Sequence, residues 1–251
     1  MVIVRVFLAL VLLNIISFYA NAWADIRIAT YLEPPFAYVD EGELVGENID
    51  IAKLLANAAG YSPVFIQCPI ARCLSMIKQG QADMIIALRK TKARQEFMSF
   101  LNPPYYIQHD PIKFYTLAAA NIKIKNFEDL ELLTVGTLRG TRYFDQFDQD
   151  DTLNKVEVST IGQLINLLKK DRIDTFLERE ESVLAWIDKS EYQKLFQLAE
   201  YEYDNAVGVY IGISKKSLHH NDINNLSKQL SLLVSQGIIQ NILDGNNPQQ
   251  P

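Results

Sequence analysis

The sequence predicts an α/β protein of two similar lobes, each a mostly parallel sheet flanked by helices. Strand-like and helix-like segments alternate along the 251 residues, which is typical of parallel sheets. The alternation runs twice, and residues 76–86 are echoed at 167–177: both stretches read as a helix end, a polar turn, an aspartate and a strand. Extended apolar segments at 112–118 and 207–213 predict two crossovers between the lobes.

Residues 1–24 have the features of a secretory signal peptide. Arg5 supplies the positive charge, residues 6–20 form an apolar stretch, and Ala22-Trp23-Ala24 fits a cleavage site. The alternative, a membrane anchor, is disfavoured because the apolar run is short for a span. We therefore expect a periplasmic protein that is cleaved near Ala24.

The first lobe is expected to comprise residues 25–108 and 208–251. Strands are predicted at 26–30, 64–67 and 84–88, and helices at about 49–59 and 71–80. Asn48 is the predicted cap of the first of these helices, and Gly60 follows its end. The C-terminal part adds a final helix from about residue 223 to Gly237.

The second lobe is expected to span residues 109–207. Strands are predicted at 132–135, 156–158 and 173–177, and a helix at 181–188. Thr160-Ile161-Gly162-Gln163 has the form of a capping box, so another helix is predicted to begin there. A short helix is also predicted to follow the turn formed by residues 136–141.

Composition excludes several functional classes. A formal net charge of −6 makes the chain a poor candidate for binding nucleic acid. Three histidines without further clustered ligands do not form a metal site, and no cofactor motif is legible, so neither is expected. Cys68 and Cys73 lie close together in an exported chain, which predicts a disulfide. A redox pair stays open, although Cys-x-x-Cys spacing is absent.

A cationic turn follows the strand predicted at 84–88. It holds Arg89, Lys90, Lys92 and Arg94, with the hydroxyl of Thr91 among them. Ligands of open α/β sheets bind at the carboxyl ends of strands, and an arginine there can hold a carboxylate with two parallel hydrogen bonds. The alternative is a solvated basic turn.

Several motifs follow one another in a distinctive order and spacing: Glu33-Pro34-Pro35-Phe36-Ala37-Tyr38, Gly46-x-x-Ile49-Asp50-Ile51-Ala52, Gly80-x-x-Asp83, Thr91-x-x-Arg94, Phe100-x-x-Pro103 with Tyr105-Tyr106, Gly136 with Gly140-Thr141, and Arg172-Ile173-Asp174. In these motifs the chain resembles family 3 of the bacterial extracellular solute-binding proteins, the periplasmic binders of polar amino acids and their relatives. The resemblance covers nearly all of the chain after residue 24. It implies the type II periplasmic-binding-protein fold, in which two lobes joined by two hinge strands close on a ligand.

The resemblance also assigns roles residue by residue. Arg94 matches the family arginine that binds the ligand's α-carboxylate, and Thr91 the hydroxyl residue of the same loop. Gly140 and Thr141 match the second-lobe site that meets the carboxylate at a helix start, where free N–H groups favour an anion. Arg89 is expected to belong to a solvated basic turn instead of the site.

The sequence departs from the amino-acid-binding pattern at the other end of the ligand. The family's acid for the amino group falls at Arg179, which lies between Glu178 and Glu180. Either glutamate could substitute, or the ligand could lack an amino group. Glu33 stands where an aromatic residue is common and is a candidate for binding a ligand cation.

Three further residues complete the predicted site. Tyr31 and Phe36 could supply an apolar surface, or could equally belong to the core. Arg72, at the start of its helix, could point into the cleft or could cap the cysteine loop.

These observations predict a monomeric periplasmic protein that binds a small carboxylate-bearing ligand, has no catalytic activity, and serves a membrane permease or sensor. Two alternatives stay open. The first is an enzyme of the same architecture, a cyclohexadienyl-type dehydratase that uses cleft carboxylates such as Glu33, Glu178 and Glu180. The second is a structural or chaperone-like exported protein without a specific small ligand.

Overall fold

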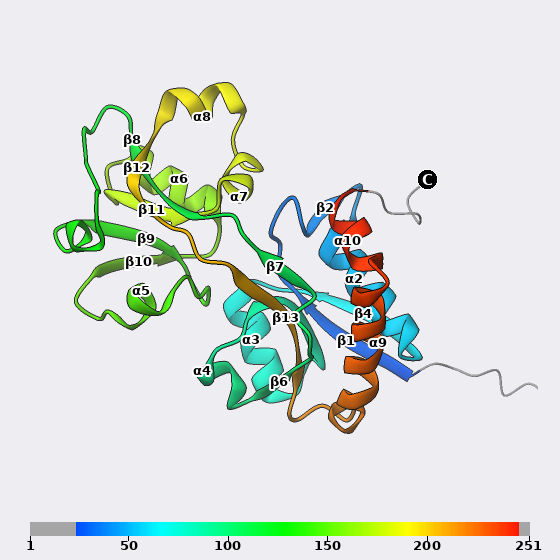
Figure 1. Cartoon of the computed structure of the whole chain (residues 1–251). Helices are drawn as coiled ribbons and strands as arrows, with labels where there is room; N and C mark the ends of the chain where they lie inside the picture. The colour runs from blue at the N-terminus through cyan, green and yellow to red at the C-terminus, as the bar shows by residue number, and fades with distance from the viewer. Residues whose placement is uncertain (1–23, 246–251) are drawn as a thin grey trace, which may run out of the picture.

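The computed structural model describes residues 24–245, which form two α/β lobes lying side by side (Figure 1). Each lobe is built on its own sheet, and together they confirm the predicted α/β class. The predicted signal peptide falls almost wholly on residues 1–23 and so lies outside the described part. Among the described residues, no helix is long and apolar enough to span a membrane.

The first sheet combines the beginning of the chain with its later return. Its strand order is β4 (Tyr61–Gln67), β1 (Ala24–Thr30), β5 (Met84–Arg89), β13 (Val207–Ser214) and β6 (Met98–Phe100), and β7 (Tyr106–Gln108) also pairs with β13. Strands β4, β1 and β5 run parallel, whereas β13 runs antiparallel to β5. The remaining elements of this lobe are β2 (Tyr38–Asp40), β3 (Glu43–Val45), α2 (Glu47–Ala58), α3 (Ile70–Gln79), α4 (Lys92–Gln95), η2 (His220–Asp222), α9 (Ile223–Ser235) and α10 (Ile238–Leu243).

Helices cover both faces of this sheet, so its strands are apolar on both sides. Met84 and Ile86 of β5 pack in the cluster that contains α2, α9 and α10. Ile85 and Leu88 pack in the opposite cluster, with Ile77 of α3. The apolar residues of β5 thus serve two separate cores, which fixes the end of this strand between them.

The second sheet carries the second lobe. Its strand order is β10 (Asn154–Val158), β9 (Thr134–Leu138), β11 (Thr175–Glu178), β8 (Ile112–Leu117) and β12 (Phe196–Tyr203). Its faces are covered by aromatic-rich clusters around Phe144 and Phe176. The associated helices are η1 (Phe127–Leu130), α5 (Asp145–Gln149), α6 (Ile161–Lys169), α7 (Glu180–Leu184) and α8 (Lys189–Leu195).

Two connections join the lobes in the middle of the molecule (Figure 1). The chain leaves the first sheet after β7 and enters the second with β8; it returns between β12 and β13. The predicted crossover segments are therefore strands of the sheets themselves, and the crossings lie just before them, at residues 109–111 and 204–206. The assignment of residues 25–108 with 208–251 and of 109–207 to separate lobes stays a prediction.

Several predicted boundaries were wrong for identifiable reasons. Asn48 does not cap α2: the cap is Gly46, at φ 113°, where a Cβ would stand 2.4 Å from the carbonyl oxygen of Phe36. Asn48 is instead buried in the helix and accepts a hydrogen bond from the Tyr105 hydroxyl at 2.8 Å.

In the second lobe, Gly136 lies inside β9 rather than in a turn, and α5 begins only after Phe144. The helix predicted at 181–188 is the shorter α7, and α8, β12 and α10 were not predicted. Thr160 does cap α6, because its hydroxyl accepts a hydrogen bond from the Gln163 N–H at 3.2 Å. The capping box is incomplete, since the Gln163 side chain accepts from Ser159 instead.

Candidate ligand cleft

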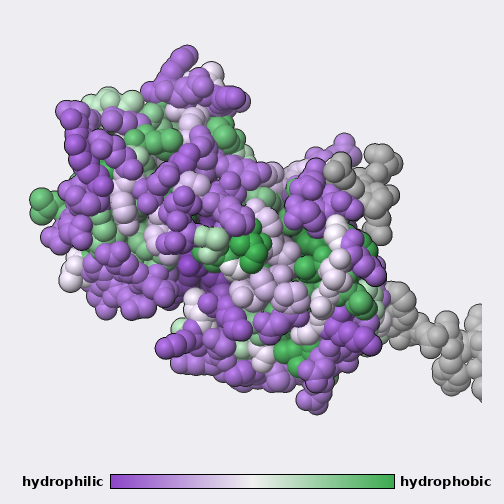
Figure 2. All heavy atoms as spheres, viewed as in Figure 1, coloured by the Kyte–Doolittle hydropathy of each residue, from purple (hydrophilic) through white to green (hydrophobic). Residues whose placement is uncertain are grey.

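A cavity of about 540 Å³ lies between the lobes and is lined by residues of both sheets. On the face shown in Figure 2, hydrophilic residues border the recess between the lobes. Seven of the ten predicted site residues line the cavity, namely Tyr31, Glu33, Phe36, Arg94, Thr141, Glu178 and Arg179.

The other three predicted residues lie outside the lining. Arg72 is exposed on α3. Thr91 is the cap of α4, and its hydroxyl accepts a hydrogen bond from the Arg94 N–H at 3.3 Å. Its position suits it to fixing the Arg94 backbone rather than to touching a ligand. Gly140 is connected to the site by its carbonyl, which accepts a hydrogen bond from Arg94. The helix start predicted at Thr141 is wrong, because α5 begins at Asp145.

Arg94 is the buried cation of the cleft, with only 5% of its surface exposed. Its Nη1 donates to the Arg89 carbonyl at 2.8 Å, and its Nη2 donates to the Gly140 carbonyl in the other lobe at 3.0 Å. Burial lowers the pKa of Arg94 to about 10, and the charge of Arg142 contributes to the lowering. The guanidinium therefore stays charged at neutral pH, and within residues 24–245 only two of its five N–H donors form hydrogen bonds.

Arg89 also lines the cavity, which contradicts its assignment to a solvated turn. Its Nη1 is buried and has no hydrogen-bond partner within residues 24–245. Arg89 reaches the cavity because the end of β5 is irregular: Ala87 has φ 64°, and the pairing of β5 with β13 shifts register there. Ala87, Leu88 and Arg89 consequently all reach the cavity, although simple strand alternation would place neighbours on opposite faces.

Glu33 and Glu178 approach the cavity from opposite lobes. Glu178 is the last residue of β11, is 6% exposed, and accepts a hydrogen bond from the Tyr143 hydroxyl at 3.0 Å. Burial, followed by the negative charge of Glu33, raises the pKa of Glu178 to about 7. Burial likewise raises the pKa of Glu33. Both carboxyls thus stand in an environment that disfavours their charged forms.

The structure separates the two glutamates that flank Arg179. Because β11 ends at Glu178, Glu180 belongs to α7 and does not share the strand face with Glu178. Glu180 pairs with Lys113 at 2.6 Å and lies outside the cavity lining. Arg179, between them, lines the cavity, and its Nε is buried without a partner in the described part of the chain.

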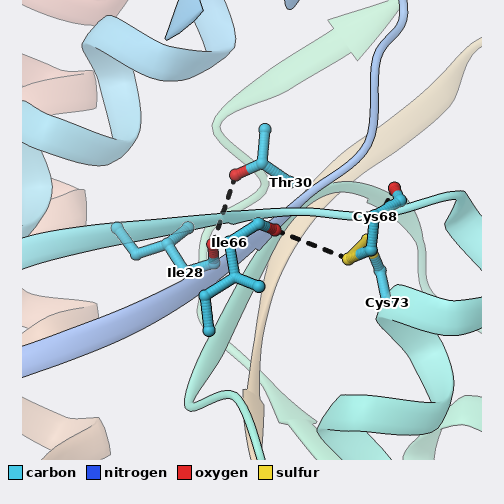
Figure 3. Close-up of a disulfide and its surroundings, with 5 residues drawn as sticks. All are labelled: Ile28, Thr30, Ile66, Cys68 and Cys73. Carbon is cyan, nitrogen blue, oxygen red and sulfur yellow. Dashed lines mark hydrogen bonds between the residues drawn. A yellow bond between two sulfur atoms is a disulfide. The ribbon is translucent and has the colours of Figure 1, made fainter.

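The apolar part of the cavity is contributed mainly by the first lobe. Tyr31 and Phe36 both line it, and the Tyr31 hydroxyl donates to the Ala87 carbonyl at 2.6 Å. The predicted disulfide between Cys68 and Cys73 is confirmed, and Figure 3 shows it joining the end of β4 to α3. Cys68 lines the cavity, so this link fixes one edge of the cleft.

Other lining residues were missed by the sequence reasoning. Arg142 and Tyr143 directly follow Thr141, a predicted site residue, and this adjacency in the sequence was the available indication that they line the cavity. Trp186 also lines the cavity from the second lobe, next to the Cα of Gly162, and no sequence pattern indicated it.

Two lobes around a shared cavity lined by apolar and charged residues define a two-lobed binding protein. The family model described as bacterial extracellular solute-binding proteins, family 3, matches residues 26–213, and the chain belongs to this family.

Two curated relatives come from Bacillus subtilis (strain 168). The chain is 22% identical over 166 residues to the probable amino-acid-binding protein YxeM, a match that covers 64% of this chain and 61% of YxeM. It is 23% identical over 144 residues to the arginine-binding extracellular protein ArtP, covering 56% of this chain and 54% of ArtP. The chain therefore spans less than two thirds of either relative's length.

Solved structures agree on the fold. An ancestral arginine-binding protein bound to arginine has a TM-score of 0.73 at 22% identity, over 88% of this chain and 97% of that one. The substrate-binding protein AbpA from Streptococcus pneumoniae Canada MDR_19A, bound to L-arginine, has a TM-score of 0.71 at 19% identity, over 89% and 94%. The predicted type II periplasmic-binding-protein fold is confirmed.

Proposed function

We propose that this chain is a non-catalytic periplasmic solute-binding protein that closes on a small carboxylate-bearing ligand, an amino acid or a related polar metabolite. The observation that carries the proposal is Arg94, a buried guanidinium on the cavity wall with donors left over. A carboxylate can accept two of these donors in the planar geometry that arginine favours.

The remaining lining residues suit a ligand with a polar far end. Tyr31 and Phe36 offer apolar contact, and Glu33 and Glu178 supply carboxyl groups from the two lobes for polar groups of the ligand. Thr141 lies beside Arg142 at the second-lobe wall, where a hydroxyl can add a hydrogen bond to the same carboxylate.

Closure follows from the placement of these groups in two lobes. A ligand that touches both walls stabilises the closed state by its differential affinity for that state. The hydrogen bond from Arg94 to the Gly140 carbonyl already joins the lobes beside the proposed carboxylate site. The closed, monomeric protein would then dock on a membrane permease or sensor, in keeping with the extracellular family.

A thermal-shift screen against amino acids, polyamines and organic acids tests the proposal. A ligand at 100 times its Kd should add about 2.7 kcal/mol to the free energy of unfolding. Arg94→Ala should abolish the ligand-induced shift for any carboxylate hit. Arg139→Ala is the matched control, because Arg139 is exposed and pairs with Glu157 on the surface of the second lobe. A hit that stabilises Arg94→Ala as strongly as wild type would refute the role of Arg94.

One observation favours a second candidate function, a dehydratase acting on cyclohexadienyl acids. Glu178, with a pKa of about 7, keeps a proton near neutral pH and could donate it to a leaving hydroxyl. Incubation with prephenate or arogenate, followed by ultraviolet detection of an aromatic product, separates the two functions. Turnover that Glu178→Gln abolishes would replace the binding-only function with catalysis.

A further inference from the structure

The cavity holds four arginines, and none of them is ion-paired within the described residues. Arg89 and Arg94 come from the first lobe, Arg142 and Arg179 from the second. Every ion pair found within 4.0 Å in residues 24–245 involves other cations, namely Arg27, Lys113, Lys125, Arg139 and Lys169. The same lining carries acidic residues as well (Glu33, Glu47, Glu178, Glu181 and Asp244), but within the described residues none of them forms an ion pair with these arginines.

Within the described residues, Arg89 and Arg179 are the two arginines that have a buried side-chain donor without an acceptor. Arg89 Nη1 and Arg179 Nε are buried and have no hydrogen-bond partner in the described part of the chain. A buried donor without an acceptor is costly, and a charged one more so. Folded proteins seldom tolerate such donors unless a ligand or water completes them.

The charge of Arg89 also acts unfavourably on the Arg179 guanidinium. Burial is the main cause that lowers the pKa of Arg179; Glu178 and Glu33 raise that pKa, and the charge of Arg89 lowers it by a smaller amount. An anion between the two arginines would accept hydrogen bonds from both unpaired donors and offset the unfavourable interaction between the two positive charges.

We propose that Arg89 and Arg179 form a second anion subsite, so that the ligand is a dicarboxylate that places one carboxylate at Arg94 and the other between Arg89 and Arg179. This inference rests on the proposed function. It differs from the arginine named for the similar solved structures, because it assigns an anion where a basic ligand would carry its second cation.

A ligand anion at this subsite must avoid repulsion by the carboxyl groups of Glu33 and Glu178. Glu33 and Glu178 both lie near Arg179, but neither accepts a hydrogen bond from its side chain in the described chain. The groups that face them are Tyr31 and Tyr105 from the first lobe and Tyr143, Asp110 and Arg179 from the second-lobe side. An anionic ligand group would drive protonation of Glu178, which could then donate a hydrogen bond to it.

The closing experiment uses isothermal titration calorimetry of the full protein at pH 7. The probes are the dicarboxylates succinate, glutarate, adipate and L-glutamate, compared with L-glutamine and L-arginine. At least one dicarboxylate should bind about tenfold or more tighter than glutamine, which corresponds to about 1.4 kcal/mol. Arg89→Gln and Arg179→Gln should remove that preference, because each should lower dicarboxylate affinity about tenfold more than it lowers glutamine affinity. Arg139→Gln should change neither.

Proton exchange on binding supplies the second readout. Titrations in two buffers of different ionisation enthalpy should show proton uptake when the tightest dicarboxylate binds, whereas a ligand cation between Glu33 and Glu178 would release a proton. Arginine or glutamine binding as tightly as every dicarboxylate, or proton release with the tightest probe, would overturn the second subsite while leaving the proposed function intact. If no carboxylate binds to wild type in an Arg94-dependent way, the proposed function itself fails.

Discussion

Asp83 and Asp174 occupy the same position in the two lobes and make the same pair of backbone hydrogen bonds. Asp83 donates its N–H to the Arg27 carbonyl at 2.8 Å and accepts from the Arg27 N–H at 2.9 Å. Asp174 does the same with Thr134, at 2.9 and 2.7 Å. In each case a residue of positive φ lies between the preceding helix and the aspartate: Gly80, at 78°, follows α3, and Asp171, at 50°, follows the C-cap of α6.

The two aspartates differ in what else they bind. Asp83 also accepts from the Arg27 guanidinium at 2.9 and 3.0 Å and from the Ser217 hydroxyl at 2.7 Å. Ser217 lies just beyond β13, 134 residues along the chain. Asp174 is half-buried, and among the described residues its hydrogen bonds are those with Thr134 alone. The repeated local motif is thus fixed in the first lobe by the returning chain, and in the second lobe stands by itself.

The largest expected effect is therefore that of Asp83→Ala. Breaking a buried ion pair costs about 3–5 kcal/mol, but the Arg27 side chain is 42% exposed and can be resolvated, so we expect about 2–3 kcal/mol. Urea unfolding followed by circular dichroism measures the loss. Asp83→Asn, which keeps an acceptor for the backbone N–H, should lose less; a loss equal to that of Asp83→Ala would show that this acceptor contributes nothing beyond the charge.

Asp83 also gives a pH dependence of known sign. Burial alone would raise its pKa, but the hydrogen bonds from Arg27 and Ser217 hold the pKa of Asp83 below its usual value. Its contribution is therefore complete above about pH 4–5 and is lost as the pH falls through the folded-state value. The stability gap between wild type and Asp83→Asn should narrow as the pH falls below about 4–5, and a constant gap would contradict this account.

Asp174→Ala should have a smaller effect, about 1 kcal/mol. It removes one hydrogen bond to a backbone N–H that can reach solvent, and leaves no buried charge behind. The same urea titration measures it. A loss as large as that of Asp83→Ala would show that the second-lobe motif has partners beyond Thr134.

The sequence predicted the features that depend on short-range patterns of residues. Periodicity located β5, α2 and α6, the repeated stretch located both aspartates, and the residues after β5 placed Arg94 at the cleft. It could not show that Ser217 reaches Asp83, because nothing local encodes a contact across 134 residues. It misplaced Arg89 because a positive φ at Ala87 changes which side chains face the cavity. It chose Asn48 over Gly46 because a glycine cap depends on how closely the Phe36 backbone approaches.

Asp171→Gly should have the smallest effect and the opposite sign, a stabilisation of about 0.5 kcal/mol. Asp171 adopts φ 50° at the end of α6, where Gly80 stands in the first lobe, and an L-residue pays to adopt that conformation. Its negative charge also faces the helix C-terminus unfavourably. The gain is partly offset because glycine loses more backbone entropy on folding. Lys170→Gly is the matched control: Lys170 has φ −103°, so the same glycine should destabilise there. If both variants lose stability equally, the left-handed backbone at Asp171 carries no cost, and the two helix ends differ in sequence alone.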